Sequence, residues 1–429
     1  MTILSADWVL PVEGAPIRDG AVALEEGRIA AVGTAAELGA GTRFEDAVIM
    51  PGLVNAHSHL EYASYAGFGD GQAFPEWLQT HIERKDRIDV SEMDAIARLG
   101  AAECLASGIT TVGDCSFSGS AALAAAELGL RAIVYLEVFG VDTREARYER
   151  LRERLGKLPE RVRIGVSPHA PYSCDLELYA ACGEFGVPVA THFAESRAEA
   201  EWARAGEGPL PGVRPTSIRE LAGAGLLGPH VLAAHCVHVD SDEIALLAEH
   251  GVGVAHCPRS NGALGCGIAP LAAMRAAGIH VGLGTDSPAS TPSFDAFEEL
   301  RAAVLFARAR EENPQALSAE EALELATLGS ARALGLGDEV GSLAPGKRAD
   351  LTVVSLADSP YLPWEDATTA VVLGGTPDRV LAVYVDGEAR YERGSFEWHE
   401  VRSTSASARR RLLGLPRHGA APTSAGPAA

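Results

Sequence analysis

Eight apolar, strand-like runs alternate with helical stretches through the middle of the chain, and this alternation restricts the fold more than any other feature. Each run is followed by a segment rich in Ala, Leu, Glu and Arg, which is typical of an amphipathic helix. The runs lie at residues 48–56, 110–112, 132–138, 163–166, 187–191, 231–234, 251–255 and 280–284. Eight such repeats predict an α/β protein whose parallel strands close into a (β/α)8 TIM barrel over residues 51–335. A doubly wound open sheet is the alternative, but the first run is not followed by a Gly-rich phosphate loop.

The two ends of the chain have a different pattern, made of short strands and turns. Residues 1–50 contain Glu26-Gly27 between alternating apolar segments, which is a hairpin signal. Residues 336–403 contain two further strand-like runs and a turn at Asp386-Gly387. We therefore expect residues 1–50 and 336–403 to form one small β-sandwich domain. Residues 404–429 hold a basic run and then a stretch rich in Ala, Pro, Gly and Ser, which predicts a flexible tail.

Charge and cysteine content restrict the partners and the compartment. The formal net charge of -22 argues against nucleic acid and anionic membranes as partners. No apolar run reaches the roughly 18 residues that a membrane helix needs, and the first residues lack a secretion signal. The seven cysteines show no CxxC spacing, so a disulfide framework is not expected. We expect a cytoplasmic protein that acts on a small molecule.

Residues able to bind a metal ion follow the strand-like runs at the end where a barrel places its active site. The first run ends at His57 and His59, and two imidazoles two residues apart on a strand point to the same side. His192 follows the fifth run and Asp286 follows the eighth. Three imidazole nitrogens and one carboxylate suit Zn²⁺, with Fe²⁺ as the second choice. The sequence therefore predicts His57, His59, His192 and Asp286 as ligands of one divalent metal ion.

Two further residues fit acid–base roles beside such an ion. Glu195 lies three residues beyond His192, where it could take a proton from a metal-activated water. His235 follows the sixth run and could stabilise the same water, with His238 as the alternative. A single histidine after a strand is often only structural, and His256 is interpreted in that way. The prediction of a metal site depends on where the histidines lie, because seven of the 13 fall at or just beyond the ends of the strand-like runs.

These motifs resemble the amidohydrolase superfamily, in its cytosine-deaminase/chlorohydrolase-like branch. The matching segments are residues 51–60, 167–173, 191–195, 234–238, 256–261, 284–287 and 341–350. The resemblance implies the same four metal ligands, with Glu195 and His235 as the acid–base pair and Asp286 as a helper in proton transfer. It also implies that His169 contacts the substrate and that the protein is a homodimer. None of the three lysines ends a strand-like run, so we expect one metal ion and not a lysine-bridged pair.

Within this branch, residues 57–61, 74–78 and 257–261 look most like aminodeoxyfutalosine deaminases. Those enzymes convert 6-amino-6-deoxyfutalosine, a menaquinone precursor, to futalosine and ammonia. The resemblance therefore implies hydrolytic deamination of an adenine-type nucleoside, whereas spacing alone indicates only metal-assisted hydrolysis. Arg259 could meet the benzoate carboxylate of that substrate, and Glu61 could touch the substrate or orient a ligand histidine. For each of these two residues a structural role is the alternative.

Other activities use the same set of residues. Methylthioadenosine/S-adenosylhomocysteine deaminases are close relatives of the aminodeoxyfutalosine deaminases and are one alternative. Other purine or pterin deaminases and triazine-type chlorohydrolases are further alternatives. An inactive metal-binding homologue is the alternative that is not an enzyme. The presence of both Glu195 and His235 beside a full ligand set argues against it.

Overall fold

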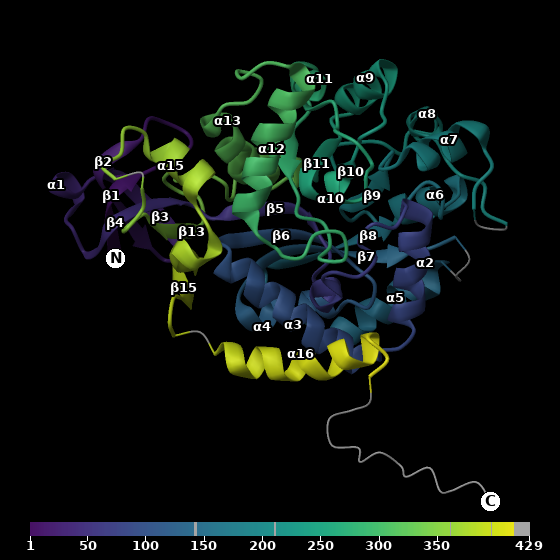
Figure 1. Cartoon of the computed structure of the whole chain (residues 1–429), viewed down its shortest axis with the longest axis horizontal. Helices are drawn as coiled ribbons and strands as arrows, with labels where there is room; N and C mark the ends of the chain where they lie inside the picture. The colour runs from purple at the N-terminus through teal and green to yellow at the C-terminus, as the bar shows by residue number, and fades with distance from the viewer. Residues whose placement is uncertain (141–143, 210–211, 361, 396, 416–429) are drawn as a thin grey trace, which may run out of the picture.

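The computed structural model of the chain describes residues 1–140, 144–209, 212–360, 362–395 and 397–415. A barrel occupies the centre of the molecule, and a smaller β-sheet lies beside it (Figure 1). The smaller sheet joins purple N-terminal strands to yellow-green C-terminal strands, so the two ends of the chain meet in one domain.

Eight parallel strands form the barrel, as the sequence predicts. They are β5 (Leu53–Ser58), β6 (Ile109–Ser116), β7 (Arg131–Val138), β8 (Val162–Pro168), β9 (Val189–Phe193), β10 (Val231–His235), β11 (Gly253–His256) and β12 (Val281–Leu283). A bridge between Ser58 and Asp286 closes the ring, and the Asp286 N–H donates to the His57 carbonyl at 3.0 Å. These strands are buried on both faces, which explains their nearly continuous apolar runs.

Helices cover the outside of the barrel, and many of them begin at a side-chain cap. Asp89, Asp175, Ser217, Asp240 and Ser318 each accept a hydrogen bond from a backbone N–H of the first turn. The helices from the barrel region are α2 (Phe74–Lys85), α3 (Val90–Ala106), α4 (Ser120–Leu128), α5 (Arg144–Leu155), α6 (Leu176–Glu184), α7 (Arg197–Ala205), α8 (Ile218–Gly223), α9 (Ser241–Glu249), α10 (Pro258–Ala263), α11 (Leu271–Ala276), α12 (Ala296–Glu311), α13 (Ala319–Glu324) and α14 (Ser330–Ala333), with the short turns η1 (Leu60–Tyr65) and η2 (Leu325–Gly329). Over the described ranges, no helix combines the length and the apolar character needed to cross a membrane.

The interior of the barrel is packed, which leaves one end for a polar site. Ile133, Tyr135 and Leu232 form an apolar cluster with Leu334. Gly253 begins β11, and a Cβ there would lie 2.3 Å from the carbonyl oxygen of the last residue of α14. The α14 segment therefore closes the end at which the strands begin, so the functional site lies at the opposite end, where they finish.

The smaller domain is one seven-stranded sheet that curls around its own apolar core. Its order is β15 (Glu388–Glu392), β14 (Val380–Val385), β13 (Leu351–Ser355), β4 (Thr42–Pro51), β1 (Thr2–Val9), β2 (Ile17–Glu25) and β3 (Arg28–Thr34), with α1 (Ala35–Leu38), α15 (Ala367–Gly374) and η3 (Pro377–Arg379) in its connections. Pairing of β4 with β1 and with β13 joins the two ends of the chain. The turn between β2 and β3 reaches back to residues 346–349 through backbone hydrogen bonds, which encloses the core.

The first strand-like run, residues 48–56, contains two strands and not one. Its first part belongs to β4 of the smaller sheet, and its second part is β5 of the barrel. Gly52 separates them, and a Cβ at this position would lie 2.1 Å from side-chain atoms of Thr110. The chain crosses between the domains at a point where only glycine fits.

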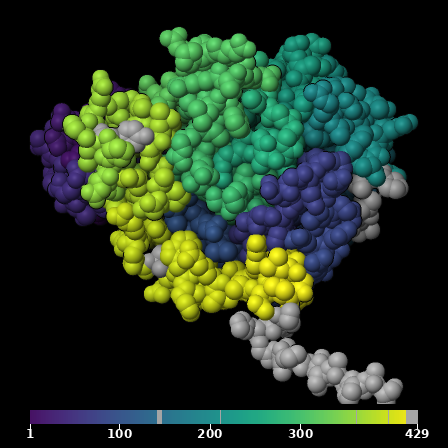
Figure 2. Space-filling model, viewed as in Figure 1, coloured from purple at the N-terminus to yellow at the C-terminus, as the bar shows by residue number. Residues whose placement is uncertain are grey.

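The predicted flexible tail needs correction over residues 404–412. These residues form the second half of α16 (Trp398–Leu412), which packs on α3 and η1. In Figure 2 its yellow surface lies along the lower edge of the molecule. Val401, Ala408 and Leu412 are buried on one face of the helix, and Arg409 donates to the carbonyl of Ser64. The apolar residues have helical spacing, which outweighs the Ala- and Ser-rich composition; residues 416–429 lie outside the described ranges.

A buried ion pair connects the barrel to the smaller sheet and leads to a stability prediction. The Arg131 guanidinium donates to both carboxylate oxygens of Asp350 at 2.8 and 3.1 Å, and to Asp386 at 2.6 Å. Only 4% of the Arg131 side chain and 1% of the Asp350 side chain are exposed. Arg131→Met would leave a buried carboxylate without its cation, so we expect the free energy of unfolding to fall by about 3–5 kcal/mol in urea denaturation.

The double variant Arg131→Met/Asp350→Asn is the control for this prediction. It removes both charges, and it should recover part of the stability that the single variant loses. A single variant that loses less than about 1 kcal/mol would contradict the assigned role of the pair.

Candidate active site

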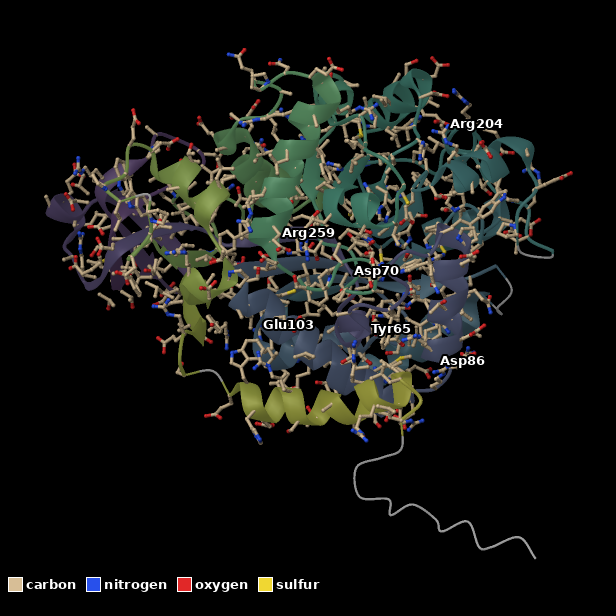
Figure 3. All side chains as sticks on the ribbon, viewed as in Figure 1. Tyr65, Asp70, Asp86, Glu103, Arg204 and Arg259 are labelled. Atoms are coloured by element: carbon tan, nitrogen blue, oxygen red, sulfur yellow. The ribbon has the colours of Figure 1, made fainter. Side chains whose placement is uncertain are left out.

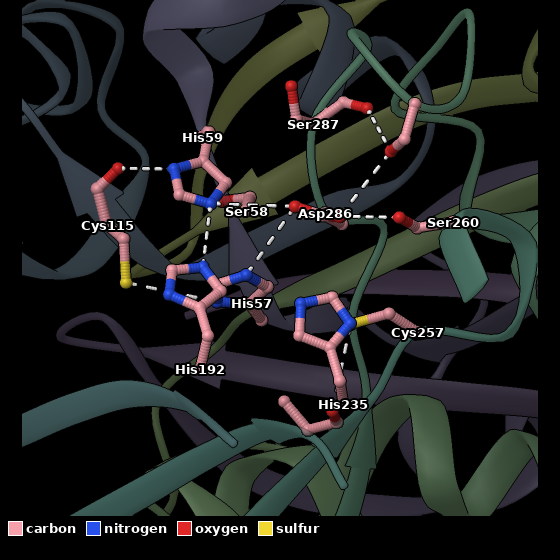
Figure 4. A network of polar contacts seen from close by, with 12 residues as sticks. His57, Ser58, His59, Cys115, His192, His235, Cys257, Ser260, Asp286 and Ser287 are labelled. Carbon is pink, nitrogen blue, oxygen red and sulfur yellow. Dashed lines mark hydrogen bonds and ion pairs between the residues drawn. The ribbon is translucent and has the colours of Figure 1, made fainter. Parts of the chain in front are cut away.

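The four predicted metal ligands converge at the end of the barrel where the strands finish (Figure 4). His57 and His59 lie at the end of β5, His192 lies in β9, and Asp286 follows β12. Asp286 Oδ1 is 3.6 Å from His57 Nε2 and 3.5 Å from His59 Nε2. His59 Nε2 is 3.3 Å from His192 Nε2. Residues that are up to 229 positions apart therefore direct their donor atoms at one point.

The chemistry of this cluster fits a divalent metal ion. His57 Nε2 is buried and has no hydrogen-bond partner among the described residues. Burial lowers the pKa values of His57, His59 and His192, which favours the neutral imidazoles that bind metals. Neutral imidazole nitrogens and one carboxylate oxygen around a common point form a ligand set for Zn²⁺ or Fe²⁺.

Hydrogen bonds from the far side of the rings orient two of the histidines. His59 Nδ1 donates to the Cys115 carbonyl at 2.9 Å, and His192 Nδ1 donates to the His169 carbonyl at 2.6 Å. These bonds set the tautomer in which Nε2 has a free lone pair. Cys115 also contacts the cluster through its thiol, whose Sγ lies 3.9 Å from His57 Nδ1 (Figure 4).

The backbone around the site is constrained. Asp286 and His235 adopt positive φ angles of 56° and 70°, which are uncommon for residues other than glycine. Ser260 Oγ donates to Asp286 Oδ2 at 2.6 Å and leaves Oδ1 directed at the histidines. A Cβ at Gly284 would lie 2.8 Å from the Cβ of His57, so glycine lets β12 approach β5. Close packing thus determines where the carboxylate lies.

Glu195 and His235, the residues expected to form an acid–base pair, lie next to the ligand cluster. Glu195 Oε2 is 3.9 Å from His235 Nε2. His235 Nδ1 donates to Asn261 Oδ1 at 2.9 Å, and the Glu195 N–H donates to the Glu199 carboxylate at 2.9 Å. Burial, helped by the negative charge of Asp286, raises the pKa of the Glu195 carboxyl well above its usual value. This carboxyl is suited to exchange a proton with a substrate.

A cavity of about 310 Å³ opens onto this centre. His169, the residue expected to contact the substrate, lines this cavity, and Ser173 Oγ lies 2.9 Å from its Nδ1. Aromatic rings form much of the remaining wall: Tyr62, Phe74, Trp77, Phe139, Tyr172 and Trp202. Such a cavity suits a flat heteroaromatic ring whose polar edge faces the metal ligands.

Arg259 does not reach this cavity, which corrects the predicted contact with a substrate carboxylate. Its guanidinium lies beside α12 (Figure 3), 2.9 Å from Glu298 and 3.5 Å from Glu299. It also donates to the carbonyls of Ser293 and Asp295. Arg259 therefore anchors the start of α12, which is the structural alternative for this residue.

Glu61 is also placed away from the cavity lining, and its predicted contact with substrate needs the same correction. Its buried carboxylate accepts hydrogen bonds from Ser116 Oγ at 2.5 Å and from the N–H groups of Phe117, Ser118 and Ser120. Glu61 thus holds the loop between β6 and α4.

Two charged residues that line the cavity were missed in the sequence. Glu137 is the second-last residue of β7, so a closer inspection of the ends of the strand-like runs could have found it. Lys85 is the last residue of α2. No strand-end pattern marks Lys85, because a helix brings it to the cavity.

Comparisons with known proteins agree with this architecture. The Amidohydrolase family matches residues 48–390. A 5-methylthioadenosine/S-adenosylhomocysteine deaminase of Symbiobacterium thermophilum is 38% identical, over 91% of this chain and 93% of the relative. A 5′-deoxyadenosine deaminase of Methanothermobacter thermautotrophicus is 32% identical, over 89% and 91%. The crystal structure of an adenosine deaminase from Xanthomonas campestris with bound zinc matches with a TM-score of 0.87 and 30% identity, over 96% of this chain and 99% of that chain.

Proposed function

The chain belongs to the amidohydrolase family, and from this premise we propose that it is a metal-dependent hydrolytic deaminase of adenine nucleosides. The observation that carries the proposal is the placement of Glu195 and His235 beside the convergent donor atoms of His57, His192 and Asp286. The activities named for its relatives support the same class of substrate.

The ligand cluster would hold the ion, with Zn²⁺ preferred because a similar solved structure contains zinc. A bound divalent ion would supply the Lewis acidity that makes water a nucleophile near neutral pH. Glu195 would take a proton from the attacking water and deliver it to the ring nitrogen next to the amino-bearing carbon. His235 would hydrogen-bond to the oxygen that adds to this carbon. The remaining proton on that oxygen passes to the amino group and the carbon–nitrogen bond breaks, so that nucleoside and water give the oxo product and ammonia.

The preferred substrates are adenine nucleosides altered at the 5′ position. Relatives named for methylthioadenosine, S-adenosylhomocysteine and 5′-deoxyadenosine support this choice. The preference for 6-amino-6-deoxyfutalosine depended in part on Arg259, whose guanidinium is held by Glu298 and Glu299. That nucleoside, which is also modified at the 5′ position, therefore stays one member of the proposed substrate class.

A substrate panel with metal analysis of the same sample tests this function. We expect one ammonia per nucleoside from methylthioadenosine, S-adenosylhomocysteine, 5′-deoxyadenosine or 6-amino-6-deoxyfutalosine, and one divalent ion per chain. Guanine and a chlorotriazine serve as controls for the other activities of this fold. Hydrolysis of either control without ammonia release from any adenine nucleoside would overturn the proposal.

A further inference from the structure

A positively charged side chain lies on the wall of the active-site cavity, and the Arg147 guanidinium lies nearby over the same pair of rings, Phe117 and Phe139. Among the described residues that line it, Lys85 is the one with a permanent cationic side chain. Its Nζ lies 3.6 Å from the ring centroid of Phe117 and 5.8 Å from that of Phe139. No hydrogen bond or ion pair joins this ammonium to another described residue. In a chain with a net charge of -22 and three lysines, an ammonium placed in a cavity without a hydrogen-bond acceptor among the described residues is unusual.

The position of Lys85 is distinct from the site of deamination. The ring of His192, a proposed metal ligand, lies 4.9 Å from the ring of His169. His169 lies 5.1 Å from Phe139, which in turn faces Lys85. Two side chains therefore separate the ammonium from His192 along one wall. A nucleoside whose amino-bearing edge meets Glu195 would direct its sugar and 5′ substituent away from the metal ligands and along such a wall.

The surroundings of Lys85 favour an anionic partner. Burial lowers the pKa of its ammonium, which means that the charge is poorly solvated. Glu137 lines the same cavity and its carboxylate attracts the ammonium, which raises the pKa of Lys85 and offsets part of the burial effect. No ion pair or hydrogen bond among the described residues joins the two side chains. A carboxylate brought in by a ligand could accept a hydrogen bond from Nζ and relieve this desolvation. Neutral 5′ substituents such as a methylthio group would leave the ammonium without an acceptor.

Resting on the proposed deaminase function, we propose that Lys85 binds a carboxylate on the 5′ substituent and makes this enzyme selective for anionic adenine nucleosides. The role is one of substrate selection, since Lys85 lies away from the reacting carbon. Arg259, the residue first expected to do this, is occupied elsewhere.

A matched pair of substrates isolates this interaction. 5′-S-(2-carboxyethyl)-5′-thioadenosine and its methyl ester differ in one charge and share the reacting ring. The variants are Lys85→Met, Lys85→Arg and, as a control, Lys157→Met, which removes the same charge from an exposed position. We expect wild-type protein to prefer the acid. Lys85→Met should lower the ratio of kcat/KM for acid over ester by about 10- to 100-fold, mainly through KM. Lys85→Arg should keep most of the ratio, and Lys157→Met all of it.

Two results would overturn the proposal. One is an equal loss on acid and ester in Lys85→Met, which would give Lys85 a structural role against Phe117; thermal unfolding of the variant identifies a folding defect. The other is a wild-type preference for the ester. Failure of the underlying function has a different signature, because wild-type protein would then release no ammonia from the acid, from the ester or from any other adenine nucleoside of the panel.

Discussion

Replacing Glu195 by glutamine is expected to lower kcat for deamination by about 10²- to 10⁴-fold while the metal content stays unchanged. Glutamine keeps the size of the side chain and its place beside His235, but it cannot take a proton from water. Metal binding should survive, because the converging donor atoms belong to other residues. Ammonia release at saturating substrate and metal analysis by mass spectrometry measure the two quantities on one sample.

The matched control is Glu201→Gln, which makes the same change at an exposed position on α7. It should behave as wild type in both measurements. Wild-type activity in the Glu195→Gln protein would show that Glu195 is not the proton carrier. If the variant also lost its metal, Glu195 would have to be counted among the groups that hold the ion.

Asp286→Asn is expected to remove both bound metal and activity, with a loss in kcat/KM of about 10³-fold or more. Asp286 Oδ1 faces His57 and His59, and its charge offsets that of a divalent ion. Asparagine adopts positive φ readily, so the 56° angle at this position should not itself disturb the fold. The measurements are metal stoichiometry after dialysis and deaminase activity.

Asp338→Asn, at an exposed position, is the control for the charge change. Circular dichroism of both variants establishes that the loss at Asp286 is not unfolding. A variant that kept one ion per chain and normal turnover would show that the carboxylate is not a ligand, and the predicted site would then need a different set of residues.

Local sequence patterns predicted the barrel and a set of candidate site residues that the structure places together. Each barrel strand was recognisable because it is buried on both faces, and the predicted closure is confirmed by the bridge from Ser58 to Asp286. His57, His59, His192 and Asp286 could be grouped because parallel strands bring their ends to one edge. The structure brings all four together, with Glu195 and His235 next to them.

Residues on helices and loops were harder to assign, because their neighbours come from distant parts of the chain. Arg259 is held by Glu298 and Glu299 on α12, some 40 residues away. The carboxylate of Glu61 accepts hydrogen bonds from backbone N–H groups of a loop more than 55 residues later in the sequence. Both residues lie in sequence motifs close to histidines of the candidate active site. This proximity suggested that they contact the substrate, but their hydrogen bonds do not support that role.

By itself, the order of apolar runs and the residues that follow them determined the barrel, the merging of the two chain ends and the identity of the metal-binding candidates. These features depend on the periodicity with which residues are buried, and that periodicity can be recognised within short stretches of the sequence. The docking of α16, the ion pair of Arg131 with Asp350 and the placement of Lys85 in the cavity were decided only by the tertiary structure. Each of them is a contact between elements distant in sequence, and its formation depends on packing geometry that no local pattern encodes.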